Sequence, residues 1–389
     1  MRKICVVTGT RAEYGLLCRL IRMIDEASET QLQLIATNMH LSETYGNTYH
    51  EIEADGFYID KKIPILEDDA KDNANATLKS MSKALSGFAD AFEELNPDLV
   101  VVLGDRYEIL AAATAALIER IPIAHIHGGE ITEGAYDDAM RHCITKMSSL
   151  HFASTEVYRQ RIIQLGEQPD HVFYTGALGV ENIKRMKLMD KSEIEAEIGF
   201  EIDAKTILVA YHPVTLGKRT PKEDIDDFIA ALEERKDLRI IFTMPNSDTG
   251  GQVIMTAINE FVSKNRDRAK AYKSLGAVRF LSVMKQVAAV VGNSSSGLLE
   301  VPSFGRPTLN IGDRQRGRIT CESVYNCSSS KTSILEGLDI VLSMPFQKRA
   351  SLVHNPYEKD NTAEEIFKVI STYPLEKLKN KHFYDIPKA

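Results

Sequence analysis

The stretch Val291 to Glu300, VGNSSSGLLE, follows an apolar run that begins at Ala288. This abrupt change to small polar residues predicts a strand, a tight turn and the start of a helix. The unpaired N–H groups of a helix start and the positive end of its dipole favour an anion. We therefore expect a nucleotide diphosphate, with its phosphates on Ser294 to Ser296 and its ribose hydroxyls on Glu300. The alternative is that Asn293 and Ser294 only cap a helix.

Length and composition narrow the class of protein. A chain of 389 residues exceeds what one hydrophobic core usually organises, so we expect two domains. The formal charge of −8 argues against a nucleic-acid partner, because phosphate backbones are bound by clustered Lys and Arg. No run approaches the ~20 apolar residues of a membrane span. The chain also enters its first apolar run, Ile4 to Val7, without a signal peptide, so we expect a cytoplasmic protein with no membrane partner.

The cysteines give no sign of a crosslinked or metal-stabilised fold. There are five of them, an odd number, and none forms a Cys-x-x-Cys pair. This pattern favours neither a disulfide framework nor a zinc ribbon. We expect free thiols or small core residues.

Short apolar runs alternate with amphipathic helical segments, which is typical of parallel sheets with crossover helices. We expect an α/β protein of two Rossmann-like domains that face a central cleft. The domains are residues 1–176 and 177–363, and residues 364–389 return to pack on the first domain. The expected strands are Ile4–Val7, Leu32–Ala36, Asp98–Leu103, Ile123–Ile126 and Val172–Thr175, then Ile207–Tyr211, Arg239–Thr243, Ala288–Val291 and Pro307–Ile311. Ligands of such sheets bind beyond the carboxyl ends of the strands.

Two motifs at expected strand ends of the first domain carry groups for acid and base chemistry. Asp105 and Arg106 place a carboxylate beside a guanidinium, although Asp105 could be only a helix N-cap. In the motif HIHGGE, His125 to Glu130, two glycines would let the backbone approach a ligand, while His127 and Glu130 can exchange protons. Two alternating histidines also suggest a metal, but no third ligand lies at metal spacing. We expect no metal and no cofactor, with His125 a core histidine.

Other candidates are acidic, imidazole and cationic groups in loops. Asp137 and Asp138 precede Arg141, although acids at this position also simply favour a helix start. His212, in Tyr-His-Pro after a strand, could lie near a leaving diphosphate oxygen. Cations that read diphosphates include Arg11 in the first domain and, after the strand Pro307–Ile311, Arg314, Arg316 and Arg318. The alternative for the last three is a solvated surface.

These motifs together resemble the UDP-N-acetylglucosamine 2-epimerase family, in particular its hydrolysing branch on the sialic and legionaminic acid routes. The resemblance spans nearly the whole chain, and the order and spacing of its short motifs are specific. They are TGTRAEYG (Thr8–Gly15), YGNT (Tyr45–Thr48), GDR (Gly104–Arg106), HIHGGE (His125–Glu130), RHCITKM (Arg141–Met147), HPVT (His212–Thr215), GNSSSG (Gly292–Gly297) and IGDRQRGR (Ile311–Arg318). The resemblance implies the two-domain fold of metal-independent glycosyltransferases, with UDP on the second domain.

The resemblance also implies roles for particular residues. UDP binding would fall to Arg11, Arg106, Gly176, His212, Ser294, Ser295, Glu300 and Arg314. Acid and base chemistry would fall to Asp105, His127, Glu130 and either Asp137 or Asp138, with His212 at the leaving diphosphate. Other branches carry a glutamate where this chain has His127, so the role of that residue does not transfer directly. Glu130 or an aspartate is the alternative.

The reaction implied is elimination of UDP across C1 and C2 of the sugar to a 2-acetamidoglucal, followed by hydration with inversion at C2. UDP-N-acetylglucosamine would give N-acetylmannosamine; the alternative substrate is UDP-2,4-diacetamido-2,4,6-trideoxyglucose (UDP-N,N'-diacetylbacillosamine). Three other functions are alternatives: a glycosyltransferase of the same fold, a non-catalytic nucleotide-sugar sensor and a dinucleotide dehydrogenase. The dehydrogenase would need a Gly-x-Gly-x-x-Gly motif after the first strand, and Thr8 to Gly15 lacks that spacing. We expect a homodimer or homotetramer, with the helix face Ala84 to Phe92 as a candidate contact.

Overall fold

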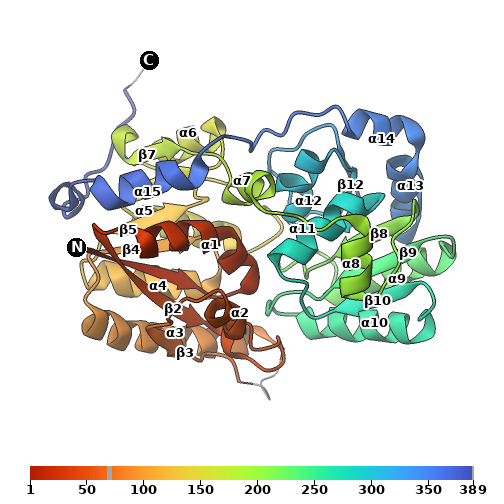
Figure 1. Cartoon of the computed structure of the whole chain (residues 1–389), viewed down its shortest axis with the longest axis horizontal. Coiled ribbons are helices and arrows are strands. Elements are labelled where there is room, and N and C mark those ends of the chain that lie inside the picture. Colours follow the sequence, from red (N-terminus) through yellow and green to blue (C-terminus); the bar gives the residue numbers. More distant parts are fainter. Residues whose placement is uncertain (68–71, 388–389) are drawn as a thin grey trace. The chain divides into compact units, whose positions relative to one another are not determined.

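A computed structural model of the chain describes residues 1–67 and 72–387. The chain forms two compact units (Figure 1). Unit 1 comprises Met1–Glu130, Asp137–Asn182 and Tyr357–Ala389, and unit 2 comprises Ile131–Tyr136 and Ile183–Pro356. In the described ranges, no helix is both long enough and apolar enough to cross a membrane.

Within the described residues, unit 1 is built on a seven-stranded parallel sheet in the order β3-β2-β1-β4-β5-β6-β7. Its strands are β1 (Arg2–Thr8), β2 (Thr30–Thr37), β3 (Lys61–Ile63), β4 (Leu99–Leu103), β5 (Ile123–Ile126), β6 (Leu150–Ala153) and β7 (Val172–Tyr174). Its helices are α1 (Arg11–Glu26), α2 (Tyr49–Ala54), α3 (Ala74–Leu95), α4 (Tyr107–Ile118), α5 (Asp137–Met147), α6 (Glu156–Gln164) and α15 (Thr362–Thr372), with 3-10 turns Asn38–Leu41, Pro169–His171 and Leu375–Leu378. Helix α7 (Leu178–Arg185) runs from unit 1 into unit 2.

Both faces of this sheet are covered. Side chains alternate along a strand, so Ile4 and Val6 of β1 pack in one core with α1 and α15, while Cys5 and Val7 pack in the other with α3 and α4. Because both faces are buried, β4 reads as an uninterrupted apolar run.

Unit 2 has a six-stranded parallel sheet in the order β10-β9-β8-β11-β12-β13. Its strands are β8 (Thr206–Ala210), β9 (Arg239–Thr243), β10 (Ala269–Tyr272), β11 (Ala289–Gly292), β12 (Thr308–Ile311) and β13 (Val324–Cys327). Its helices are α8 (Lys191–Ile198), α9 (Pro221–Glu234), α10 (Gly251–Lys264), α11 (Ala277–Gln286), α12 (Ser296–Leu299), α13 (Lys331–Leu342) and α14 (Met344–Ala350), with the 3-10 turn Val301–Phe304. The predicted α/β class with two Rossmann-like sheets is confirmed.

The end of the chain returns to unit 1, where α15 packs on α1 (Figure 1). The backbone N–H of Ala177 donates to the carbonyl of Tyr357 (3.0 Å), and the hydroxyl of Thr362 donates to the carbonyl of Thr175 (2.7 Å). The return was predicted from residue 364, and in the structure unit 1 resumes at Tyr357.

The segment Ile131–Tyr136 lies in unit 2, although both its neighbours in the chain lie in unit 1. The backbone N–H of Glu133 donates to the carbonyl of Arg316 (3.0 Å), and the carbonyl of Gly134 accepts from Leu216 (3.1 Å). The predicted domain 1–176 did not include this excursion. The loop between β5 and α5 is therefore held by both units.

Most apolar side chains of the expected dimer contact on α3 are already covered within the chain. Ala84, Phe88, Ala91 and Phe92 are buried in the core of unit 1, against β4 and α4. Side chains already covered within one chain are not free to cover a second chain. A homodimer or homotetramer stays a prediction without an assigned surface.

Candidate active site

The turn after β11 in unit 2 is fixed by Gly292 and Asn293. Gly292 has a φ of +138°, and a Cβ there would lie 2.1 Å from the carbonyl oxygen of Ala210 in β8, so no side chain fits. Asn293 is fully buried; its side chain accepts from the backbone N–H of His212 (2.7 Å) and donates to the carbonyl of His212 (2.7 Å). Asn293 therefore joins the ends of β8 and β11 and does not cap a helix.

The helix after this turn is shorter than the sequence predicted. Helix α12 has four residues, and Glu300 leads directly into the 3-10 turn Val301–Phe304. Pro302 has no N–H and cannot continue an α-helical ladder. A helix does open at this turn, as expected, but its four residues give only a small dipole. Anion binding here would depend on the serine hydroxyls, the backbone N–H groups and nearby cations.

Four predicted UDP ligands meet around Asn293. Ser294 and Ser295 follow it and are partly exposed. Its carbonyl accepts hydrogen bonds from Arg314 Nη1 (3.3 Å) and from Gln315 Nε2 (2.9 Å). His212 is held by the asparagine side chain, as described above. Glu300, the fifth predicted ligand in unit 2, is 6% exposed at the end of α12.

In unit 1, Asp105 follows β4 and is positioned by His125. The carbonyl of Gly104, which has a φ of +83°, lies 2.7 Å from His125 Nε2, and Thr145 Oγ1 lies 3.2 Å from Nδ1. Burial lowers the pKa of His125 to about 3, so this ring is neutral. The prediction that His125 is a core histidine is confirmed.

Arg141 of α5 brings three predicted acid/base residues together. Its guanidinium, 1% exposed, pairs with the Asp105 carboxylate through Nη2. Its Nη1 donates to the backbone carbonyl of Glu130 (2.9 Å) and to Asp138 Oδ1 (3.2 Å). Asp137 is buried in the first turn of the same helix, so both aspartates also satisfy the alternative of helix-starting acids.

His127 and Glu130 lie together at the carboxyl end of β5. His127 Nδ1 is 3.0 Å from Glu130 Oε1, which accepts a hydrogen bond from Ser154 Oγ (2.7 Å). Packing accounts for Gly128 and Gly129, and their expected role in letting the backbone approach a ligand stays a prediction. A Cβ on Gly128 would lie 2.9 Å from Thr145 Oγ1, and one on Gly129 would lie 2.5 Å from the carbonyl oxygen of Tyr158. Both glycines permit packing within unit 1.

Arg106 belongs to a buried charged cluster beside the loop that carries Arg11. Its Nε donates to Glu108 Oε1 (2.7 Å), and Glu108 is fully buried. Glu13 accepts from the backbone N–H groups of Gly9 (2.7 Å) and Thr10 (3.2 Å). Burial, then repulsion from Glu108, raises the pKa of Glu13 to about 8. This carboxylate pair was not predicted from the sequence, although the Thr10-x-x-Glu13 pattern is typical of a capping box and indicates where Glu13 lies.

Arg11 and Gly176, the two remaining residues predicted to bind UDP, lie close to other residues of the protein. Arg11 begins α1, and its Nη1 lies 3.7 Å from Glu51 Oε1. Gly176 has a φ of +84°, and a Cβ there would lie 2.6 Å from Lys359 Cβ, so packing accounts for this glycine. A role for either residue in UDP binding stays a prediction. Among the described residues, no group of three or more His, Cys, Asp or Glu side chains is arranged to hold a metal ion.

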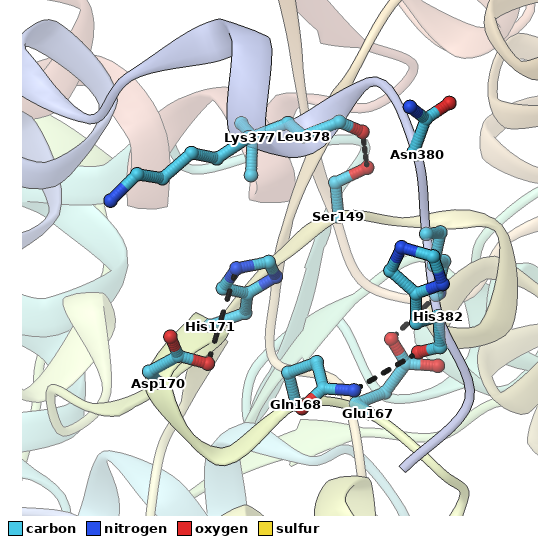
Figure 2. A pocket seen from close by; sticks show the side chains of 10 residues that line it. Ser149, Glu167, Gln168, Asp170, His171, Lys377, Leu378, Asn380 and His382 are labelled. Atoms are coloured by element: carbon cyan, nitrogen blue, oxygen red, sulfur yellow. Dashed lines mark hydrogen bonds and ion pairs between the residues drawn. The ribbon is translucent and has the colours of Figure 1, made fainter.

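A cavity of about 220 Å³ lies at the amino ends of the unit 1 strands, where β6 and β7 begin (Figure 2). Ser149, Glu167, His171 and Lys381 are among its lining residues. Glu167 binds Lys146 (2.8 Å), Lys381 (2.7 Å) and His151 (3.0 Å). None of the predicted acid/base or UDP-binding residues lines this cavity.

Both the sequence and the fold of the chain are similar to those of known proteins. The sequence profile of the family described as UDP-N-acetylglucosamine 2-epimerase matches residues 22–371. The chain is 45% identical over 325 residues, 84% of either chain, to the GDP/UDP-N,N'-diacetylbacillosamine 2-epimerase (hydrolyzing) of Campylobacter jejuni. It is 41% identical to the polysialic acid biosynthesis protein P7 of Escherichia coli, covering 100% of this chain and 99% of that protein. The crystal structure of UDP-GlcNAc 2-epimerase from Neisseria meningitidis bound to UDP-GlcNAc shares the fold, with a TM-score of 0.77 at 19% identity over 95% and 99% of the two chains.

Proposed function

Because the chain belongs to the UDP-N-acetylglucosamine 2-epimerase family, we propose that it is a hydrolysing 2-epimerase of a UDP-2-acetamido sugar. The observation that carries this proposal is the Arg141 network, which holds Asp105, Asp138 and the backbone of Glu130 in one cluster beside His127. A protein that only bound a nucleotide sugar would need the Ser294–Glu300 turn but not these groups. The cluster favours an enzyme.

The proposed reaction begins with loss of UDP from C1 and of the proton from C2. C2 has no adjacent carbonyl to acidify its proton, so the C1–O bond must break early and leave positive charge on the ring. Carboxylates such as Asp105 stabilise that charge electrostatically. Ser294, Ser295, Glu300, Arg314 and His212 would bind the departing UDP, together with Arg11 and Arg106. Water then adds at C1, and C2 is protonated on the opposite face.

Two substrates are supported by relatives. The name of the Campylobacter jejuni relative favours UDP-N,N'-diacetylbacillosamine. UDP-N-acetylglucosamine is favoured by the name of a Neisseria meningitidis relative, UDP-N-acetylglucosamine 2-epimerase, which is 30% identical over 345 residues. The name of the Escherichia coli relative indicates only polysialic acid biosynthesis. The two sugars differ at C4 and C6. We propose the same elimination and hydration for either one, with UDP-N-acetylglucosamine as the first substrate to test.

The deciding experiment is turnover of each UDP-sugar in heavy water, with separation of the products. We expect free 2-epimeric sugar and UDP, with deuterium at C2, because the proton added in the second step comes from solvent. Product of unchanged configuration without deuterium at C2 would exclude the epimerase. A glycosyltransferase would give no free sugar without an acceptor, so the same assay separates that alternative.

A further inference from the structure

His127 is held in a strained backbone conformation directly after β5. Its φ is +67°, in the left-handed region that residues other than glycine rarely adopt. Its backbone N–H donates to the carbonyl of Phe152 in β6 (2.9 Å), and the tightly packed Gly128 and Gly129 fix the chain that follows. Strain of this kind persists only where the surrounding structure imposes it, and it gathers at functional sites.

The imidazole of His127 has a carboxylate beside one nitrogen. Nδ1 lies 3.0 Å from Oε1 of Glu130, a residue that is 1% exposed. The same oxygen accepts a hydrogen bond from Oγ of the fully buried Ser154 (2.7 Å), so the carboxylate cannot turn freely. A carboxylate next to Nδ1 keeps the proton of a neutral imidazole on that atom and leaves the lone pair on Nε2.

The second ring nitrogen of His127, Nε2, is buried and makes no hydrogen bond with the described residues. Leaving a buried polar atom without a partner is unfavourable, and such atoms are few in native proteins. A lone pair that is both oriented by a carboxylate and left without a protein partner is suited to a ligand proton.

We propose that His127 Nε2 is the base that removes the C2 proton of the sugar, and that Glu130 is a positioning residue that acts through His127. The inference rests on the proposed function. As Nε2 takes the proton, the electron pair of the C2–H bond becomes the C1=C2 double bond, and the electron pair of the C1–O bond leaves with UDP. The imidazolium formed in this step lies against the Glu130 carboxylate, which stabilises it, and it returns its proton to solvent.

The charged groups around the pair are distributed over three elements. Arg141 of α5 donates to the carbonyl of Glu130 (2.9 Å), and Arg161 of α6 donates to the carbonyl of Gly129 (2.6 Å). After β4, Asp105 pairs with Arg141, and Asp138 binds the same guanidinium. The side chain within 3.0 Å of the His127 ring is that of Glu130, so replacing its charge should act mainly on that ring.

The first test replaces His127 with glycine. Glycine adopts a positive φ without strain, so His127→Gly should fold and bind UDP while it loses turnover by about 10²-fold or more, the scale of one general base. Free imidazole added to the assay should restore part of the turnover. Full turnover in His127→Gly, or no restoration by imidazole in a variant that still binds UDP, would overturn the assignment. If the wild-type protein forms no epimeric product, the proposed function fails instead.

The second test separates positioning from simple structural support. Glu130→Gln removes the carboxylate that holds the imidazole, so turnover should fall by about tenfold or more while UDP affinity is kept. In the His127→Gly background the same change should have little further effect, because residues that act through one another are not additive. The matched control is Glu167→Gln, which removes the carboxylate from the other buried glutamate–histidine pair of unit 1. The control should leave turnover unchanged in both backgrounds. Wild-type turnover in Glu130→Gln, or an equal loss with and without His127, would show that Glu130 does not act through His127.

Discussion

Two buried glutamate–histidine pairs lie at opposite ends of neighbouring strands in unit 1. At the carboxyl ends of the strands, His127 Nδ1 is 3.0 Å from Glu130; we call this the carboxyl-edge pair. At the amino ends, His151 Nε2 is 3.0 Å from Glu167; we call this the amino-edge pair. In both pairs the second ring nitrogen is buried without a partner among the described residues. The pairs therefore share their chemistry and their separation, and these properties alone do not identify a catalytic group.

The backbone and the surrounding charges distinguish the two pairs. His151 lies inside the regular strand β6, whereas His127 has left the strand and holds a φ of +67°. Glu167, which lines the cavity of Figure 2, is also bound by Lys146 (2.8 Å) and Lys381 (2.7 Å). The amino-edge pair is thus locked into a network that ties the C-terminal tail to α5. The carboxyl-edge pair carries backbone strain, which a purely structural pair does not need.

The largest effect on turnover is expected at Asp105. Its side chain pairs with Arg141, which also donates to the backbone carbonyl of Glu130 in the carboxyl-edge pair. Asp105→Asn keeps the shape of the side chain but removes its charge and basicity. We expect turnover to fall by about 10²-fold or more, while UDP affinity changes little. Steady-state kinetics with UDP calorimetry would check this. Wild-type turnover in Asp105→Asn would remove the carboxyl-edge network from the reaction.

The next effect concerns binding, and it separates loss of ligand from loss of chemistry. The double variant Ser295→Ala with Glu300→Ala removes two hydrogen-bonding groups from the turn after β11. We expect UDP binding to weaken by roughly 2–3 kcal/mol, taking about 1–1.5 kcal/mol for each group. Calorimetry is the measurement, and Ser328→Ala, which also removes a serine hydroxyl from unit 2, is a control that should keep the wild-type affinity. Unchanged affinity in the double variant would move the UDP site away from this turn.

The sequence predicted the sheets well because parallel strands buried on both faces are uninterrupted apolar runs, as in β4 and β11. It did not name β6, whose short sequence LHFA contains a histidine. It also did not predict β3, β10 and β13, whose sequences KKI, AKAY and VYNC mix polar and apolar residues because they lie at sheet edges. The pattern at Ser294–Glu300 also suggested a longer helix than α12. Pro302 could have indicated the early end of this helix, because proline cannot continue α-helical hydrogen bonding.

The candidate site could be predicted in its residue types but not in its connections. Strand ends indicated Asp105, His127 and Glu130, since the carboxyl ends of parallel strands share one edge. Nothing in the local sequence showed that Arg141 binds Asp105, or that Asn293 holds His212, because these contacts link residues 36 and 81 positions apart in the chain. The packing role of Gly128 and Gly129 could not be predicted, because a glycine needed for packing looks the same in sequence as one needed for a ligand.

A smaller effect tests the structural role of the amino-edge pair. Burial would raise the pKa of Glu167, but its hydrogen bonds and ion pairs with His151, Lys381 and Lys146 outweigh burial and lower the pKa to about 2. A carboxylate with a lowered folded-state pKa stabilises the fold above its unfolded-state pKa of about 4.3, and this stability is lost as the pH falls towards 2. Between pH 5 and pH 3 the wild type should therefore lose about 1.5 kcal/mol more unfolding free energy than Glu167→Gln. Denaturant unfolding at both pH values is the measurement. Asp170→Asn, at a surface carboxylate that is 78% exposed, should keep the wild-type pH slope, and the same slope in Glu167→Gln would contradict the prediction.

The smallest effect is expected at Lys381, although its ammonium group is bound on several sides. It donates to the carbonyls of Lys146 (2.5 Å) and Ser148 (2.5 Å) at the end of α5, as well as to Glu167. Burial nevertheless lowers the pKa of Lys381 to about 8, so burying the charge costs more than its partners return. Lys381→Met keeps the aliphatic stem and should reduce the unfolding free energy by only about 1 kcal/mol, the scale of one hydrogen bond.

The Lys381→Met variant should act on the tail and not on the reaction. Hydrogen exchange should quicken at the backbone N–H of Tyr384, which donates to the carbonyl of Gly166 (2.9 Å), because the neighbouring anchor is lost. Turnover should stay at the wild-type level, as it should in the control Lys379→Met, whose side chain is exposed. A tenfold loss of turnover in Lys381→Met alone would contradict the comparison. It would mean that the fixed end of α5 controls the Arg141 end of the same helix, and that the amino-edge cluster takes part in the chemistry through α5.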